Sequence, residues 1–145
     1  MKMVSALTIG FGLFISVIST TWAAGDHKTP DAPADYMAME NPIDADDADA
    51  KFLKKVKRKY KSKCKKCHGT DGDGKGSAAE DMILKPTAFN TPGYFEKRKD
   101  GQLFWIIKNG SKDTEMKAFG PGSDVNLSDE EMWKLITYMQ VKFTN

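Results

Sequence analysis

The chain contains only two cysteines, Cys64 and Cys67, and His68 follows the second of them directly. With so short a spacing, no disulfide can join distant parts of the chain. On one turn of helix, two thiols three positions apart lie on the same side. The residue after the second thiol then points beneath a planar group bound to both of them. Cys-X-X-Cys-His is the attachment pattern of c-type haem, in which both thiols add to vinyl groups and the histidine reaches the iron. The sequence therefore predicts one covalent haem c, with His68 as an iron ligand.

Three other kinds of site use a similar cysteine pair. A thioredoxin-like redox pair needs a preceding strand in a βαβ unit, and no such pattern occurs here. A structural zinc site needs four ligands, but the other histidine is the distant His27, and adjacent Cys67 and His68 suit tetrahedral geometry poorly. A local disulfide between Cys64 and Cys67 is the third alternative.

Residues 1–23 have the pattern of a secretory signal peptide. Lys2 precedes an apolar run from residue 3 to residue 18, which is short for a membrane span. Thr21 and Ala23 place small residues ahead of a cut after Ala23. We expect a bacterial protein that is periplasmic or otherwise exported and has no stable membrane insertion after cleavage, with an uncleaved anchor as the alternative.

Charge divides the rest of the chain into two parts. Residues 24–49 carry eight acidic side chains against Lys28 alone, which predicts an irregular acidic arm. From Lys51 to Lys66 all ten charged residues are positive. Within this run, hydrophobic residues recur every fourth position and predict a helix with one buried stripe: Phe52, Val56, Tyr60 and Cys64. We expect residues 50–145 to form one domain.

The remaining segments predict helices and no strand. Residues 78–84 and a segment that begins at Thr91-Pro92 are short helix candidates, and residues 100–108 form a longer one. The clearest helix follows Ser128, which forms a capping box with Glu131 ahead of an apolar face. Since no alternating strand pattern of sufficient length occurs, we expect an all-α fold.

Several separated segments resemble those of class I cytochrome c, and they occur in the same order. The resemblance covers nearly all of residues 50–145 and implies an all-α class I cytochrome c fold with helices wrapped around one haem. It also implies a one-electron transfer protein rather than an enzyme. The similar segments are 64–69 (Cys-Lys-Lys-Cys-His-Gly), 85–89, 100–110, 116–119 and 127–133.

The second axial ligand has to come from the opposite side of the ring, on a segment far enough from His68 to wrap around it. Met116 meets this requirement and lies in a segment similar to the methionine loop of the family, although its two neighbours differ from the usual Gly and Pro. By the same resemblance, the Pro86 carbonyl accepts a hydrogen bond from the other ring nitrogen of His68. We expect four apolar residues against the ring: Phe89, Leu103, Phe104 and Ile107.

The other methionines have simpler explanations. Met132 and Met139 lie on the apolar face of the last helix, where core packing explains them. Met82 follows the haem motif too closely to reach the far face of the ring easily. With His68 and Met116 as ligands, both axial positions are filled and the reduction potential is raised, which suits an electron carrier.

Two further patterns carry little weight. Asp71 to Gly76 begins like a calcium loop, but Lys75 and Met82 occupy ligand positions. In another protein, the lysine run would indicate nucleic-acid binding. A signal peptide and a haem motif in the same chain argue against that interpretation. We expect these lysines to steer a redox partner with an acidic docking surface, or else to form a solvated helix face. A second hypothesis has the acidic arm folding over this basic face.

The favoured function is a diffusible electron carrier between redox partners. The alternative is a cytochrome subunit of a larger dehydrogenase or oxidase complex. Less favoured is a haem peroxidase or gas-binding protein in which Met116 does not hold the iron.

Overall fold

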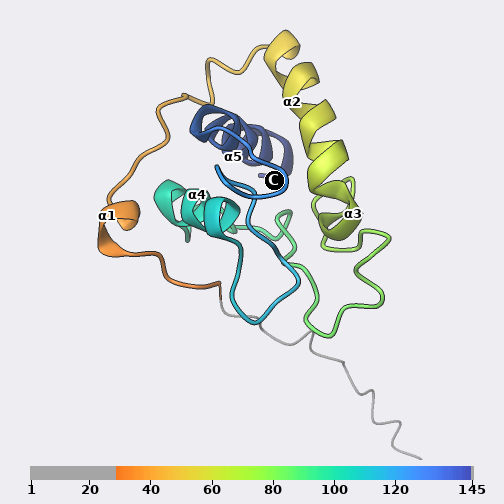
Figure 1. The fold of residues 1–145 in the computed structure, drawn as a ribbon. Helices are drawn as coiled ribbons and strands as arrows, with labels where there is room; N and C mark the ends of the chain where they lie inside the picture. The colour runs from red at the N-terminus through yellow and green to blue at the C-terminus, as the bar shows by residue number, and fades with distance from the viewer. Residues whose placement is uncertain (1–28, 145) are drawn as a thin grey trace, which may run out of the picture.

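The computed structural model describes residues 29–144 (Figure 1). The expected signal peptide and His27 therefore lie outside the described residues. Five helices and no strand are present between residues 29 and 144, which confirms the all-α prediction. They are α1 (Ala34–Met37), α2 (Ala50–Lys63), α3 (Lys65–His68), α4 (Asp100–Asn109) and α5 (Asp129–Phe143). None of these helices has both the length and the apolar character of a membrane span.

Helix α2 packs against α5 through the stripe that the sequence predicts. Val56 and Tyr60 are buried, and the Tyr60 ring lies 5.5 Å from that of Tyr138, centroid to centroid. An ion pair between Lys59 and Glu131 joins the same two helices at the surface. Most other charged residues of α2 face solvent, so the positive charge of this helix is displayed rather than neutralised.

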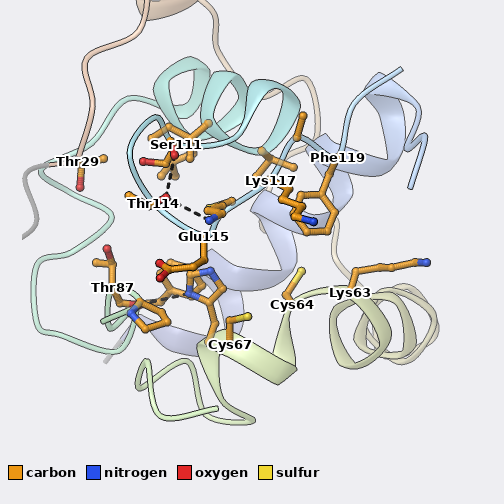
Figure 2. Close-up of a pocket in the computed structure, with 18 of the residues that line it drawn as sticks. Thr29, Lys63, Cys64, Cys67, Thr87, Ser111, Thr114, Glu115, Lys117 and Phe119 are labelled. Atoms are coloured by element: carbon orange, nitrogen blue, oxygen red, sulfur yellow. Dashed lines mark hydrogen bonds between the residues drawn. The ribbon is translucent and has the colours of Figure 1, made fainter. Parts of the chain in front are cut away.

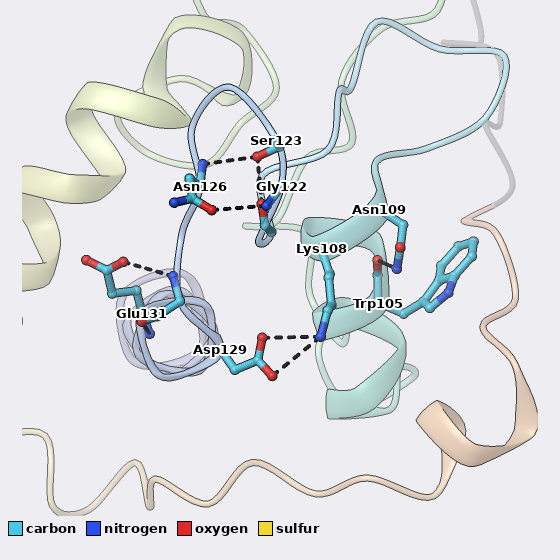
Figure 3. A network of polar contacts seen from close by, with 10 residues as sticks. Trp105, Lys108, Asn109, Gly122, Ser123, Asn126, Asp129 and Glu131 are labelled. Atoms are coloured by element: carbon cyan, nitrogen blue, oxygen red, sulfur yellow. Dashed lines mark hydrogen bonds and ion pairs between the residues drawn. The ribbon is translucent and has the colours of Figure 1, made fainter.

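Helix α4 packs against the other side of α5. The rings of Phe104 and Trp133 stack with centroids 4.2 Å apart, and Lys108 Nζ lies 3.2 Å from Asp129 Oδ1 (Figure 3). The predicted capping box is present, since Glu131 N donates to Ser128 Oγ and Ser128 N donates to Glu131 Oε2. Helix α5 is thus the central element of the fold, in contact with both α2 and α4 (Figure 1).

Two predicted short helices are absent. Residues 78–84 and the segment from Thr91 onward form turns. In the first segment, Ala78 N donates to Lys66 O of α3, and Met82 N donates to Ala79 O, three residues back, as in a turn. In the second, the side chains of Tyr94 and Phe95 are both buried in the core, which fixes the chain in turns. Tertiary contacts override the local helix signals at both places.

The acidic arm, as far as it is described, packs on α4 and α5. Gly101 N donates to Met39 O (3.2 Å), and Asn41 Nδ2 donates to Thr137 Oγ1 (2.9 Å). The ring of Tyr36 stacks on Phe104 with centroids 6.2 Å apart. The hypothesis that this arm covers the basic face of α2 is therefore wrong for residues 29–43. They find hydrogen-bond partners and apolar contacts on α4 and α5, whereas Asp49, at the end of the arm, caps α2 by accepting a hydrogen bond from Phe52 N (2.7 Å).

Candidate haem-binding site

The two cysteines sit at the junction of α2 and α3. Cys64 ends α2 and precedes α3, and both Cys67 N and His68 N donate to Cys64 O, at 3.2 and 2.9 Å. This single turn puts the two thiols on one side, and Figure 2 shows both pointing into the space beneath the loop of Glu115 and Lys117. Both thiols are free, so the structure contains no local disulfide between them.

Backbone contacts fix α3 in place after His68. Helix α3 ends at His68 and is followed by Gly69, whose φ of 78° is a conformation that glycine adopts without strain. The Tyr60 hydroxyl donates to Gly69 O, and the loop that follows folds back so that Gly74 N donates to His68 O. Hydrogen bonds from Tyr60 of α2 and from Gly74 of the following loop therefore fix the end of the Cys-X-X-Cys-His segment through protein contacts alone.

A cavity of about 280 Å³ opens beside these residues, and all five predicted site residues line it: Cys64, Cys67, His68, Pro86 and Met116. Its other walls are largely apolar and come from α4, α5 and the intervening loops. Of the four residues expected against the ring, Phe89, Leu103 and Ile107 line the cavity. Phe104 does not, because its ring is buried between Tyr36 and Trp133.

The His68 ring is fixed by stacking and by one polar contact. It stacks on Phe89 with centroids 4.4 Å apart, and its Nδ1 lies 3.4 Å from Thr87 O. This contact differs from the predicted one to Pro86. The Pro86 carbonyl instead faces Gly74, where an added Cβ would lie 2.3 Å from that oxygen. Burial lowers the pKa of His68, which favours the neutral imidazole that binds metals.

Met116 reaches the cavity from a loop with its own hydrogen bonds. Met116 N donates to Thr114 Oγ1 (3.1 Å), and Thr114 Oγ1 donates to Ser111 O (2.8 Å; Figure 2). Ser111 N in turn donates to Met116 O (2.9 Å). No sequence pattern indicates Thr87, Ser111 or Thr114, because their contacts depend on loop geometry that residue spacing does not encode.

The donor set fits a haem c. Two thiols on one side of a helical turn suit two thioether bonds, and a buried imidazole and a thioether suit iron. Burial raises the pKa of Cys64 to about 12, so this thiol is uncharged in its apolar surroundings. Within residues 29–144, no group of three or more His, Cys, Asp or Glu is arranged to hold a metal ion.

A family model agrees with this assignment, and a solved structure has a similar fold. The family model described as cytochrome C oxidase, cbb3-type, subunit III, matches residues 51–139. A comparison with the curated proteins finds no match. Among solved structures, a chain of the reducing HAO-like protein complex of Kuenenia stuttgartiensis is similar, with a TM-score of 0.55 and 23% identity. The match covers 80% of the present chain and 50% of the solved one, so the chain spans about half the length of that relative.

Proposed function

Because the chain belongs to the c-type cytochromes, in the family described as cytochrome c oxidase, cbb3-type, subunit III, we propose that it carries single electrons on one haem c. Membership of this family implies covalent haem c and an electron carrier rather than an enzyme. The observation that carries the proposal is the position of Cys64, Cys67, His68 and Met116 on the walls of one largely apolar cavity. Only two cysteines are present, which is compatible with one haem.

Each of the four residues has a separate role in the proposal. The thiols of Cys64 and Cys67 would form the thioether bonds to the haem, and His68 and Met116 would be the residues that hold its iron. When bound, haem c supplies a reversible one-electron couple. The chain contributes a buried, apolar enclosure and a thioether ligand, both of which favour the reduced state and raise the potential.

Binding of carbon monoxide to the ferrous protein tests the closed site. With His68 and Met116 both on the iron, the wild-type protein should bind carbon monoxide weakly, and Met116→Ala should bind it readily. Mass spectrometry of the denatured protein should show a mass increase of one haem. Ready binding by the wild type would favour the gas-binding or peroxidase alternative, and the absence of a covalent haem would reject the cytochrome assignment.

The proposal includes export to the periplasm and a partner with an acidic docking surface. The basis for this partner is the positive charge on α2 and α3, where every charged residue from Lys51 to Lys66 is basic. Electron-transfer rates with such a partner should fall as ionic strength rises, because salt screens the attraction between exposed charges. A rate independent of salt would mean that these lysines are a solvated surface only.

A subunit role is the second candidate. Two observations favour it: the family description names an oxidase subunit, and the similar solved chain is part of a protein complex. The two candidates differ in behaviour during purification at low salt. A carrier should elute as a monomer, whereas a subunit should elute with the other chains of its complex.

A further inference from the structure

One segment of the arm reaches the wall of the haem-binding cavity. Residues 29–43 run from this cavity along α4 to α5, and Thr29 and Pro30 line the cavity (Figure 1). The segment lies outside residues 51–139, which the family model matches. We propose that residues 29–43 are a strap that closes this wall of the cavity, keeps water from the haem there and so raises the reduction potential. The inference rests on the proposed function and makes the strap a part of the haem site.

Two side chains at and just before the start of α4 hold the strap at the cavity. Arg98 Nε and Nη2 donate to Thr29 Oγ1 at 3.2 and 2.8 Å. Gln102 Nε2 donates to Pro30 O at 2.9 Å. Arg98 is itself fixed by Tyr94, because its Nη1 donates to Tyr94 O (3.0 Å) and its guanidinium carbon lies 3.9 Å from the centre of the Tyr94 ring. Since Tyr94 also lines the cavity, these contacts attach the strap to a wall of the haem site.

The rest of the strap is anchored on α4 and α5. Asn41 Nδ2 donates to Oγ1 of the buried Thr137 on α5 (2.9 Å), and Asn41 N donates to Asp100 Oδ2 at the start of α4 (3.2 Å). Between the two ends, Tyr36 O lies so close to Gly101 that an added Cβ there would be 1.7 Å away. Because these anchors are independent of Thr29 and Pro30, the cavity end of the strap can be released while the other end stays in place.

The strap lies across the cavity from the two thiols. Figure 2 shows Thr29 on the side of the cavity away from Cys64 and Cys67. In haem, the vinyl groups lie on two neighbouring pyrrole rings and the charged propionates on the other two. A haem attached through its vinyl groups would therefore have its propionate edge on the side of the strap. This is the edge of haem that water solvates most readily.

Exclusion of water at this edge changes the balance between the two oxidation states. Ferric haem carries one more positive charge than ferrous haem, and loss of water disfavours the more highly charged state. Solvent access to a redox centre is accordingly one of the factors that set its potential. A strap that keeps water out favours the ferrous state. Opening the strap should therefore lower the potential without any change in the iron ligands.

The test releases the cavity end of the strap in the haem-loaded protein. Thr29→Val and Gln102→Met, combined, remove both hydrogen bonds to the strap with little change in side-chain size. Amide hydrogen exchange within residues 29–43 should become about fivefold faster or more. Spectroelectrochemistry should show the equilibrium shifted about tenfold toward the ferric state, which is about 59 mV for one electron. Thr29→Ser is the matched control, because it keeps the hydroxyl that Arg98 binds, and it should behave as the wild type in both measurements.

Three results would overturn the inference. Faster exchange with an unchanged potential would show that the strap does not shield the haem. Unchanged exchange would show that the bonds to Thr29 and Pro30 do not hold the strap. A lower potential together with loss of the near-infrared band that methionine gives on ferric iron would show that a ligand has changed and not the wall. A wild-type protein without covalent haem would instead contradict the proposed function itself.

Discussion

The hydroxyl of Tyr60 donates a hydrogen bond to the carbonyl oxygen of Gly69, 2.9 Å away, and the pair is buried. Burial raises the pKa of Tyr60 well above its usual range, so the hydroxyl keeps its proton. We predict that Tyr60→Phe lowers the free energy of unfolding by about 1–3 kcal/mol, because the Gly69 carbonyl loses its partner away from water. Denaturant unfolding of the haem-loaded protein measures this, and an unchanged midpoint would mean that water replaces the hydroxyl.

Gly101 marks the closest approach between α4 and the arm. A Cβ at this position would lie 1.7 Å from Tyr36 O. Alanine is the better helix former by about 1 kcal/mol, so helix propensity alone predicts that Gly101→Ala stabilises the protein. We predict the opposite, with a lower free energy of unfolding and faster proteolysis within residues 29–49, because the arm has to leave α4. Stabilisation would show that the arm contributes nothing to the fold.

The capping box of α5 gives a prediction with a matched control. Ser128 Oγ accepts a hydrogen bond from Glu131 N at 3.2 Å, and we expect Ser128→Ala to cost about 1 kcal/mol of stability. Ser62 is an exposed serine near the end of α2 whose hydroxyl bonds only to Lys59 O. Ser62→Ala should change the stability by less than about 0.5 kcal/mol. Equal effects of the two substitutions would contradict the role of the cap.

The pH dependence of the free energy of unfolding should show the contribution of Glu131 to stability. Its hydrogen bond with Lys59, together with that from Ser128 N, lowers the pKa of Glu131 below its ordinary value of 4.5. A lowered pKa in the folded state gives stability that is present above 4.5 and is lost as the pH falls through the lowered value. The difference in unfolding free energy between wild type and Glu131→Gln should therefore shrink below pH 4.5.

Glu130→Gln is the control for that measurement. Glu130 also has a lowered pKa, through its hydrogen bond with Lys134, but it is fully exposed and its pair lies within α5. Glu131 joins α5 to α2, so its substitution should have the larger effect on stability at neutral pH. If Glu130→Gln has the larger effect, the ion pair between the two helices is not what stabilises them.

Regular periodicity made part of the fold predictable. The four-residue spacing in α2 predicted the burial of Val56 and Tyr60, and Ser128 with Glu131 predicted the start of α5. These signals are local, because each depends on residues within one or two turns of the same helix. The Cys-X-X-Cys-His motif is local in the same way, because its five residues are consecutive. The sequence alone therefore predicted a haem-attachment site there.

Contacts between distant segments could not be predicted from the sequence. Asn41 bonds to Thr137, 96 positions away, and no pattern in either segment announces this pairing. The contact of His68 with Thr87 rather than Pro86 depends on which carbonyl a turn directs toward the ring. Residues 78–84 carry a helix pattern, but they form turns, and Ala78 N donates to Lys66 O of α3. Each case is a contact between segments, and single-sequence patterns do not encode such contacts.

The most direct test of the account is the near-infrared spectrum of the ferric protein, which contains a charge-transfer band when methionine binds the iron. Met82 also lines the cavity, so Met82→Ala is the matched control for Met116→Ala. We predict that the wild type and Met82→Ala show the band and that Met116→Ala lacks it. A band that persists in Met116→Ala, or that disappears in Met82→Ala, would contradict iron ligation by His68 and Met116.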